Sequence, residues 1–171
     1  RECLEEGAWG LSSGLDYPPG SYASTNELIS LCKEAVKLDG FYHTHTRAKL
    51  ISEQNFLAPW EEAIEIGKKS GIPVHLTHYK QRDSGVGSFR DYLGLVENAR
   101  DEGMDVTFDS YTYPYSGTTI TIILPEWAKD GGPEILIKHL KSNTSRKKMC
   151  NEINHESFKE NWLTNFKKPH N

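Results

Sequence analysis

Cysteines, long apolar runs and clustered positive charges are all scarce in this sequence. Of its 171 residues only three are cysteines, Cys3, Cys32 and Cys150. An odd number of cysteines without close pairs argues against a disulfide framework and fits a protein of the reducing cytoplasm. We expect Cys32 to be a core thiol, because it lies on the apolar face of a predicted helix.

Two further absences exclude classes of partner. No apolar run reaches the ~20 residues that a membrane-spanning helix needs. The 24 acidic residues outnumber the 20 lysines and arginines, and the basic residues form no stripe that would bind nucleic acid. With 36% apolar and 26% charged residues, the sequence is typical of a globular domain. We therefore expect neither a membrane nor a nucleic acid as partner.

What the sequence does contain is one strand pattern that occurs twice, at 41–47 and at 73–80. Each copy is a short, β-prone apolar run that ends in Thr-His, with a cation two residues after the histidine. The histidines, His45 and His78, are 33 residues apart, the length of about one strand–helix–strand repeat. Because ligand sites of parallel β/α proteins lie at the carboxyl ends of the strands, we expect the two imidazoles to meet there.

Such a pair of histidines is a candidate metal site. Neutral imidazole is the commonest metal ligand near neutral pH, and two imidazoles would supply half of a tetrahedral zinc shell. The competing interpretation is structural, because a single histidine at a strand end is more often a hydrogen-bonded polar residue. The repetition favours the metal. The cations that follow, Arg47 and Lys80, are expected to converge near the same pocket and to suit an anionic substrate.

Strands and helices alternate between residues 10 and 110 with a period near 30 residues. The predicted strands are 10–15, 41–46, 72–77 and 105–109, and the predicted helices are 24–39, 59–70 and 89–102. Ser24 is the expected N-cap of the first helix, and the inward side of the third should carry Phe89, Leu93, Val96 and Ala99. This alternation predicts an α/β fold with a parallel sheet, and it fits both an open sheet and half of a (β/α)8 barrel.

Several motifs follow one another in a fixed order. They are residues 7–20 (Gly-Ala-Trp-Gly-Leu-Ser-Ser-Gly-Leu-Asp-Tyr-Pro-Pro-Gly), 44–47 (Thr-His-Thr-Arg), 73–80 (Pro-Val-His-Leu-Thr-His-Tyr-Lys), 105–109 (Asp-Val-Thr-Phe-Asp), 113–119 (Tyr-Pro-Tyr-Ser-Gly-Thr-Thr), and 124–128 with the glycines at 131 and 132. In this order they resemble the N-acyl-D-amino-acid deacylases (D-aminoacylases) of the metal-dependent amidohydrolase superfamily. The resemblance implies a (β/α)8 barrel, with this chain at about strands four to seven. Residues 1–115 would form half of the barrel, and 116–171 a helical segment that begins the insertion between strands seven and eight.

The resemblance also implies roles for individual residues. It makes His45 and His78 metal ligands, and we add Arg47 to the substrate pocket because it lies two residues after His45. The implied substrate-binding positions are Tyr17, Lys80, Tyr113 and Thr119. Thr119 stands where the family has serine. The run 109–115 is two residues longer than the family's Asp-x-Tyr-Pro-Tyr, so Tyr111 competes with Tyr113 for that place.

The implied activity is zinc-dependent hydrolysis of the amide of an N-acyl-D-amino acid, a small-molecule substrate, to a carboxylate and a free D-amino acid. The family's first-strand His-x-His, its early cysteine ligand and its general-base aspartate at strand eight have no counterpart in the sequence. We therefore expect an internal fragment that is inactive by itself. Two alternatives stay open: a cyclic-amide amidohydrolase of the dihydropyrimidinase or dihydroorotase type, and a non-catalytic truncated product.

Overall fold

The computed structural model of the chain describes residues 1–50, 55–80, 87–112 and 117–154. The chain separates into two compact units, Arg1–Pro114 and Tyr115–Asn171. Within the described residues, no helix is both long enough and apolar enough to cross a membrane.

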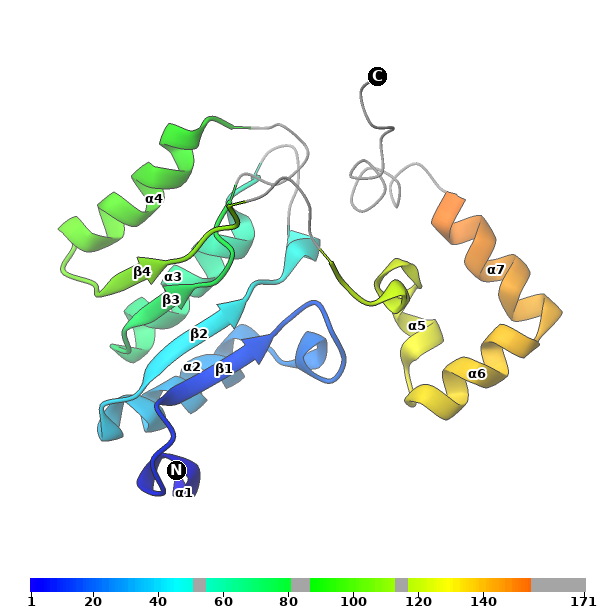
Figure 1. The fold of residues 1–171 in the computed structure, drawn as a ribbon, viewed down its shortest axis with the longest axis horizontal. Helices are drawn as coiled ribbons and strands as arrows, with labels where there is room; N and C mark the ends of the chain where they lie inside the picture. Colours follow the sequence, from blue (N-terminus) through cyan, green and yellow to red (C-terminus); the bar gives the residue numbers. More distant parts are fainter. Residues whose placement is uncertain (51–54, 81–86, 113–116, 155–171) are drawn as a thin grey trace. The chain divides into compact units, whose positions relative to one another are not determined.

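The first unit is built on a four-stranded parallel sheet whose strand order follows the sequence (Figure 1). Its strands are β1 (Gly10–Gly14), β2 (Phe41–His45), β3 (Val74–Leu76) and β4 (Val106–Phe108). The helices that connect successive strands are α2 (Thr25–Ala35), α3 (Ala58–Ser70) and α4 (Phe89–Asp101). Shorter elements are α1 (Glu2–Glu5) and the 3-10 turns Gly20–Tyr22, Val36–Leu38 and Ala48–Leu50. The predicted α/β fold and parallel strand order are confirmed.

Local sequence signals account for the helix ends. The side chain of Ser24 accepts a hydrogen bond from the backbone N–H of Glu27 at 3.2 Å, as expected of an N-cap. Gly71 ends α3 in the left-handed region, with φ of 76°, where a glycine has no side chain to clash. Helix α4 begins with a capping box between Ser88 and Asp91.

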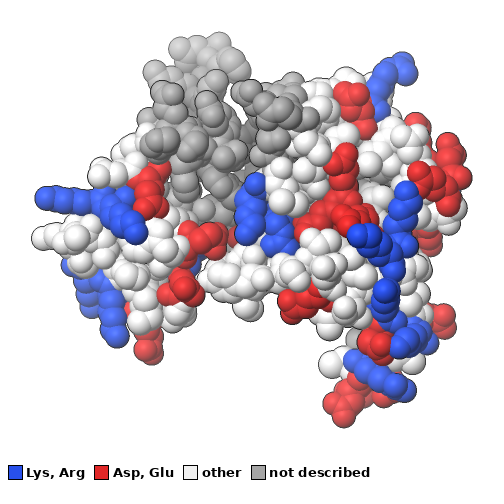
Figure 2. All heavy atoms as spheres, turned by 180° about the vertical axis from the view of Figure 1, so that it is seen from behind, with Lys and Arg blue, Asp and Glu red and all other residues white. Residues whose placement is uncertain are grey.

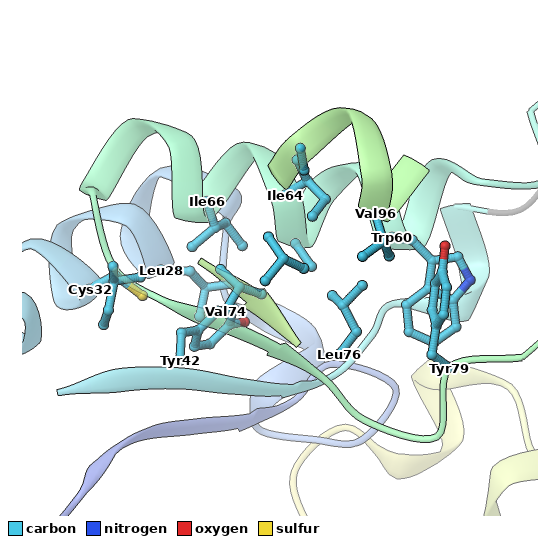
Figure 3. Close-up of a cluster of buried hydrophobic side chains, with 14 of the residues drawn as sticks. Leu28, Cys32, Tyr42, Trp60, Ile64, Ile66, Val74, Leu76, Tyr79 and Val96 are labelled. Atoms are coloured by element: carbon cyan, nitrogen blue, oxygen red, sulfur yellow. The ribbon is translucent and has the colours of Figure 1, made fainter. Parts of the chain in front are cut away.

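The helices of the first unit cover one face of the sheet, because right-handed crossovers in a sheet of sequential strand order all lie on the same side. Figure 3 shows the core that results, with helix side chains above the strands. Tyr42, Val74 and Val106 are paired neighbours that point into this core and are almost fully buried. Cys32 belongs to it as predicted, and burial raises the pKa of its thiol to about 11.

The opposite face of the sheet is polar. Because side chains alternate along a strand, the residues between the core positions point to this other face. One row across the four strands consists of Ser12, His43, His75 and Thr107. The positions that follow along the strands carry His45 and, beyond β4, Asp109. The first unit therefore has an apolar face under its helices and a face that carries histidines.

One prediction about the core was wrong. Phe89, expected to point inward from α4, is 63% exposed, whereas Tyr92 is buried. Phe89 is the first residue of the helix, ahead of the buried stripe that Tyr92, Val96 and Ala99 form. The ring of Tyr92 lies 5.7 Å from that of Phe56, so Tyr92 is the aromatic residue at the start of the buried stripe.

The second unit contains short helices. They are a 3-10 helix (Ile120–Ile123), α5 (Glu126–Lys129), α6 (Pro133–Lys141) and α7 (Asn143–Asn154). Trp127 organises them, because its indole N–H donates to Glu152 at 2.8 Å and its ring lies 5.1 Å from that of His139. Ala128 and Met149 of this unit are buried.

Charges of both signs alternate over the helices of the first unit (Figure 2). Many lie one turn apart on the same helix, as in the pairs Glu34–Lys37 and Glu65–Lys69. Such exposed pairs contribute little to stability, because water screens the charges. These ion pairs lie on a solvated surface and would not select a binding partner.

Candidate metal centre

His45 and His78 meet at the carboxyl ends of their strands. His45 is the last residue of β2, and His78 follows two residues after the end of β3. Nδ1 of His45 lies 2.7 Å from Nε2 of His78, and the rings stand edge to face with centroids 4.7 Å apart. The strand topology thus brings the two imidazoles together as expected, while their role as metal ligands stays a prediction.

Asp16, which the sequence reasoning did not select, fixes the other side of His45. Its side chain is 3% exposed, and Oδ2 lies 2.9 Å from Nε2 of His45, while Oδ1 accepts from the backbone N–H of Ala48 at 2.7 Å. A carboxylate can only accept, so Nε2 of His45 carries the proton and Nδ1 keeps its lone pair toward His78. A carboxylate behind a histidine in this way is the usual outer support of a metal-bound imidazole.

Aromatic rings and one cation surround the histidine pair. The ring of Tyr17 lies 5.2 Å from that of His45, and the ring of Tyr111 stacks on that of His78 at 5.9 Å. Nζ of Lys80 lies 5.2 Å from the centre of the Tyr111 ring. Tyr17 therefore lies beside His45, and Lys80 lies over Tyr111, whose ring contacts that of His78. Tyr111 was the competing candidate in the sequence, and of the two tyrosines it is the one within the described residues.

Two predicted substrate residues are not brought to this site by the described structure. Tyr113 lies outside the described residues. Thr119 belongs to the second unit, where it is exposed and its hydroxyl lies 3.0 Å from that of Thr121. Roles for both residues stay predictions.

The position of Arg47 corrects the expectation that two cations converge at the pocket. Its side chain is 7% exposed and is paired with Glu62, with Nε 3.2 Å from Oε2. Its two terminal nitrogens donate to the backbone carbonyls of Ser21 at 3.0 Å and Ala23 at 2.7 Å. Glu62 is equally buried and also accepts from the hydroxyl of Thr25 at 2.7 Å. Arg47 thus joins the loop after β1 to α3, a structural role.

A second polar cluster lies on the same face of the sheet. His43, His75 and Asp109 offer three donor atoms within 4.8 Å of one another. The rings of His43 and His75 stack at 5.3 Å, and Nε2 of His75 lies 2.9 Å from Oδ2 of Asp109. Burial alone would raise the pKa of Asp109, but hydrogen bonds from His75, the backbone N–H of His78 and Thr77 hold it below its ordinary value.

Comparison with known proteins gives these residues a family context. The D-aminoacylase of Alcaligenes xylosoxydans xylosoxydans is 33% identical over 121 residues, which are 70% of this chain and 24% of that protein. The N-acyl-D-glutamate deacylase of the same organism is 33% identical over 128 residues, 74% of this chain and 25% of that protein. No family model matches. The chain spans about a quarter of the length of these curated relatives.

Solved structures agree with the sequence matches. A D-aminoacylase described as defining a novel subset of amidohydrolases superposes with a TM-score of 0.52 at 34% identity, over 64% of this chain and 23% of that one. The N-acyl-D-glutamate deacylase of Bordetella bronchiseptica, in complex with zinc and a phosphonate inhibitor, superposes with a TM-score of 0.58 at 33% identity. The match covers 66% of this chain and 23% of that one.

These matches place the chain among the amidohydrolases, with which it shares an α/β fold and a parallel sheet. Within that class the chain belongs to the N-acyl-D-amino-acid deacylases.

Proposed function

We propose that this chain supplies two zinc ligands and part of the substrate pocket of an N-acyl-D-amino-acid deacylase. The observation that carries the proposal is the pair formed by Nδ1 of His45 and Nε2 of His78, 2.7 Å apart, with buried Asp16 behind His45. The homologous deacylases, one of them solved with zinc, support the choice of reaction and metal.

The architecture that goes with this function is a closed barrel. We propose that the four strands are about strands four to seven of a (β/α)8 barrel, and that residues 116–171 begin an insertion before strand eight. The polar face of the sheet supports this assignment, because in a barrel it would line the interior on which the active site opens. Three free cysteines suit a cytoplasmic location.

The residues fit a zinc ion by their chemistry. Histidine nitrogens are ordinary zinc ligands, and the proton on Nε2 of His45 leaves Nδ1 as the donor atom. His78 would contribute Nε2, the nitrogen that faces His45, once the proton that it shares with Nδ1 of His45 has left. The ligands that complete the site would come from outside this chain.

Bound zinc would polarise the acyl carbonyl and lower the pKa of a bound water toward ~7. The chain's own residues would position the substrate. Lys80 would pair with the substrate carboxylate and Tyr17 would line the pocket. Thr119 stays a proposed substrate-binding residue. A phenol, that of Tyr111 or Tyr113, would donate to the developing oxyanion. Overall the C–N bond breaks, the acyl carbon gains the water oxygen and the amine gains a proton, with a general-base aspartate from outside the chain.

Metal binding by the purified 171-residue chain tests the site directly. We expect Co²⁺ or Zn²⁺ to bind, and His45→Ala or His78→Ala to weaken binding strongly. The matched control is His139→Ala, because His139 contacts Trp127 and Ser145 and is not among the predicted ligands. Binding that is unchanged by both site substitutions would contradict the assignment.

Activity requires the full product of the gene. We expect it to hydrolyse N-acetyl-D-methionine in preference to the L enantiomer, and we expect the 171-residue chain alone to be inactive even when loaded with metal. Dihydrouracil in the same assay tests the cyclic-amide alternative, and turnover of that substrate alone would replace the proposed reaction.

Tyr111→Phe and Tyr113→Phe identify the oxyanion donor. Loss of one such donor costs about 10²–10³ in kcat. We expect the larger loss from Tyr111→Phe, because its ring stacks on that of His78. A large loss confined to Tyr113→Phe would restore the assignment made from the sequence.

A further inference from the structure

His78 is one residue out of register with the histidine it meets. Strand pairing sets Thr44 opposite Leu76, so the position that follows on β3, opposite His45, belongs to Thr77. In a regular strand, His78 would point to the same face as Leu76, which is fully buried under the helices. The sequence repeat alone therefore does not bring the two imidazoles together.

The backbone corrects this mismatch at His78 itself. His78 has φ of 42°, in the left-handed region that non-glycine residues seldom adopt. After this turn the ring of His78 reaches His45, and the next residue, Tyr79, enters the core at 5% exposure. One left-handed residue thus directs His78 to the histidine face and Tyr79 to the helix face.

Asp109 holds this turn through three hydrogen bonds. Its Oδ1 accepts from the backbone N–H of His78 at 2.6 Å. Its carbonyl accepts from the N–H of Tyr79 at 2.7 Å, and its own N–H donates to the carbonyl of Leu76 at 3.2 Å. The residues on both sides of the left-handed position are therefore tied to one aspartate, which follows β4 directly.

The second carboxylate oxygen of Asp109, Oδ2, also has hydrogen-bond partners. Oδ2 lies 2.9 Å from Nε2 of His75 and accepts from the hydroxyl of Thr77 at 3.2 Å. Nδ1 of His75 lies 2.8 Å from the hydroxyl of Thr107. A consistent assignment has His75 donating through Nε2 to the carboxylate and accepting from Thr107 through Nδ1. The carboxylate is thus oriented with Oδ1 toward the N–H of His78.

We propose that Asp109 is a positioning residue for His78, and that His75 orients Asp109 for this role. The proposal rests on the proposed function, because it treats His78 as a metal ligand. Asp109 does not contact substrate in it. Its effect passes through the backbone of the turn, which decides whether the imidazole of His78 faces that of His45.

The same residues admit one competing interpretation. His43, His75 and Asp109 have donor atoms within 4.8 Å of one another and would suit a divalent transition metal by type. Their hydrogen bonds favour the positioning role. Nε2 of His43 lies 2.9 Å from the hydroxyl of Thr77, and His75 and Asp109 are partnered as described, so the cluster is a connected network as it stands.

Metal affinity of the 171-residue chain, measured by competition of Co²⁺ with a chromophoric chelator, tests the proposal. Removal of an outer partner of a metal ligand costs about 10- to 100-fold in affinity. We expect Asp109→Ala to lose this much and Asp109→Asn less, because asparagine keeps one oxygen for the N–H of His78. Asp105→Asn, just before the same strand, is the matched control and should leave the affinity unchanged.

His75 provides a rescue pair. The side-chain amide of glutamine can still donate to Asp109, so His75→Gln should keep an affinity near that of the unchanged chain, whereas His75→Ala should weaken it. If His75→Gln keeps the Co²⁺ affinity, His75 acts by orienting Asp109 and is not itself a metal ligand, because a glutamine would not replace a histidine ligand. Circular dichroism and thermal unfolding of each variant identify any loss that comes from misfolding.

The outcomes separate this proposal from the proposed function. If the unchanged chain binds metal through His45 and His78, and folded Asp109→Ala binds it equally well, the positioning role is wrong and the metal site stands. If a His45→Ala, His78→Ala double variant still binds Co²⁺ and loses it on His75→Ala, the cluster is itself a metal site and the positioning role is overturned. If neither the 171-residue chain nor the full gene product binds metal, the proposed function fails first.

Discussion

The two histidine strands begin with the same sequence pattern and end in different surroundings. His45 closes β2 in a regular extended strand and is supported from the side by buried Asp16. His78 comes after the end of β3, in a left-handed turn, and is supported through its backbone by Asp109. The two imidazoles reach the same point, but one is oriented by its side-chain partner and the other by its main chain.

The cations that follow differ even more. Arg47 is turned into the protein and paired with Glu62, whereas Lys80 is half-buried with its ammonium over the ring of Tyr111. The difference follows from the loops. The stretch after β2 folds back over the carbonyls of Ser21 and Ala23, which need donors, and the guanidinium supplies them. Equal spacing in a sequence therefore does not imply equal roles.

Removing each cation in turn tests whether Arg47 and Lys80 differ in role. Arg47→Met should destabilise the chain by about 3–5 kcal/mol, because it leaves Glu62 charged, buried and without its partner. Lys80→Met should change the free energy of unfolding by at most about 0.5 kcal/mol. Urea unfolding of the 171-residue chain, followed by circular dichroism, measures both.

The double variant Arg47→Met, Glu62→Met is the control, since it removes both charges. It should recover part of the lost stability, because an apolar pair leaves no buried charge unpaired. If Arg47→Met and Lys80→Met both change the free energy of unfolding only slightly, the pairing of Arg47 with Glu62 contributes little to stability. Arg47 would then have no greater structural role than Lys80.

Much of the fold could be predicted because it depends on local signals. The strand order and the helices follow from apolar periodicity, from the N-cap at Ser24 and from the stop at Gly71. Phe89 was misplaced because periodicity does not say at which turn the buried stripe of a helix begins. The sequence predicted which elements exist better than which residues they bury at their ends.

The site was only partly predictable, for a physical reason. That His45 and His78 meet could be expected from strand topology, but the register mismatch and its left-handed correction depend on contacts between strands. Asp16 and Asp109 were missed, although each lies just beyond a strand end, the rule by which the histidines were found. The assignment of Arg47 to the pocket was wrong. Its pairing with Glu62 joins segments that no sequence pattern connects, so the sequence could not indicate it.

A smaller effect, on substrate binding, is expected at Lys80. In the full gene product, Lys80→Met should cost about 2–4 kcal/mol in kcat/KM on an N-acyl-D-amino acid, because a desolvated ammonium–carboxylate pair is lost. On the uncharged amide of the same substrate the loss should be far smaller. Steady-state kinetics on the two substrates measure the difference, and equal losses would leave Lys80 with a structural role only.

The smallest expected effect concerns the side-chain support of His45. In Asp16→Asn, one of the two polar atoms becomes an NH₂ group that faces a donor, either Nε2–H of His45 or the N–H of Ala48. Loss of such an outer partner costs about 10- to 100-fold in metal affinity, or about 1.4–2.7 kcal/mol. Chelator competition with Co²⁺ measures it on the 171-residue chain.

Asp39→Asn is the matched control for Asp16→Asn. Asp39 is exposed and left-handed, with φ of 55°, a conformation that asparagine also tolerates, so metal affinity and stability should both stay unchanged. Asp16→Asn tests the difference between the two supports, because it perturbs the tautomer of His45 and leaves the turn at His78 intact. An affinity equal to that of the unchanged chain would mean that His45 needs no carboxylate to present Nδ1, and that its place at the end of a regular strand is sufficient.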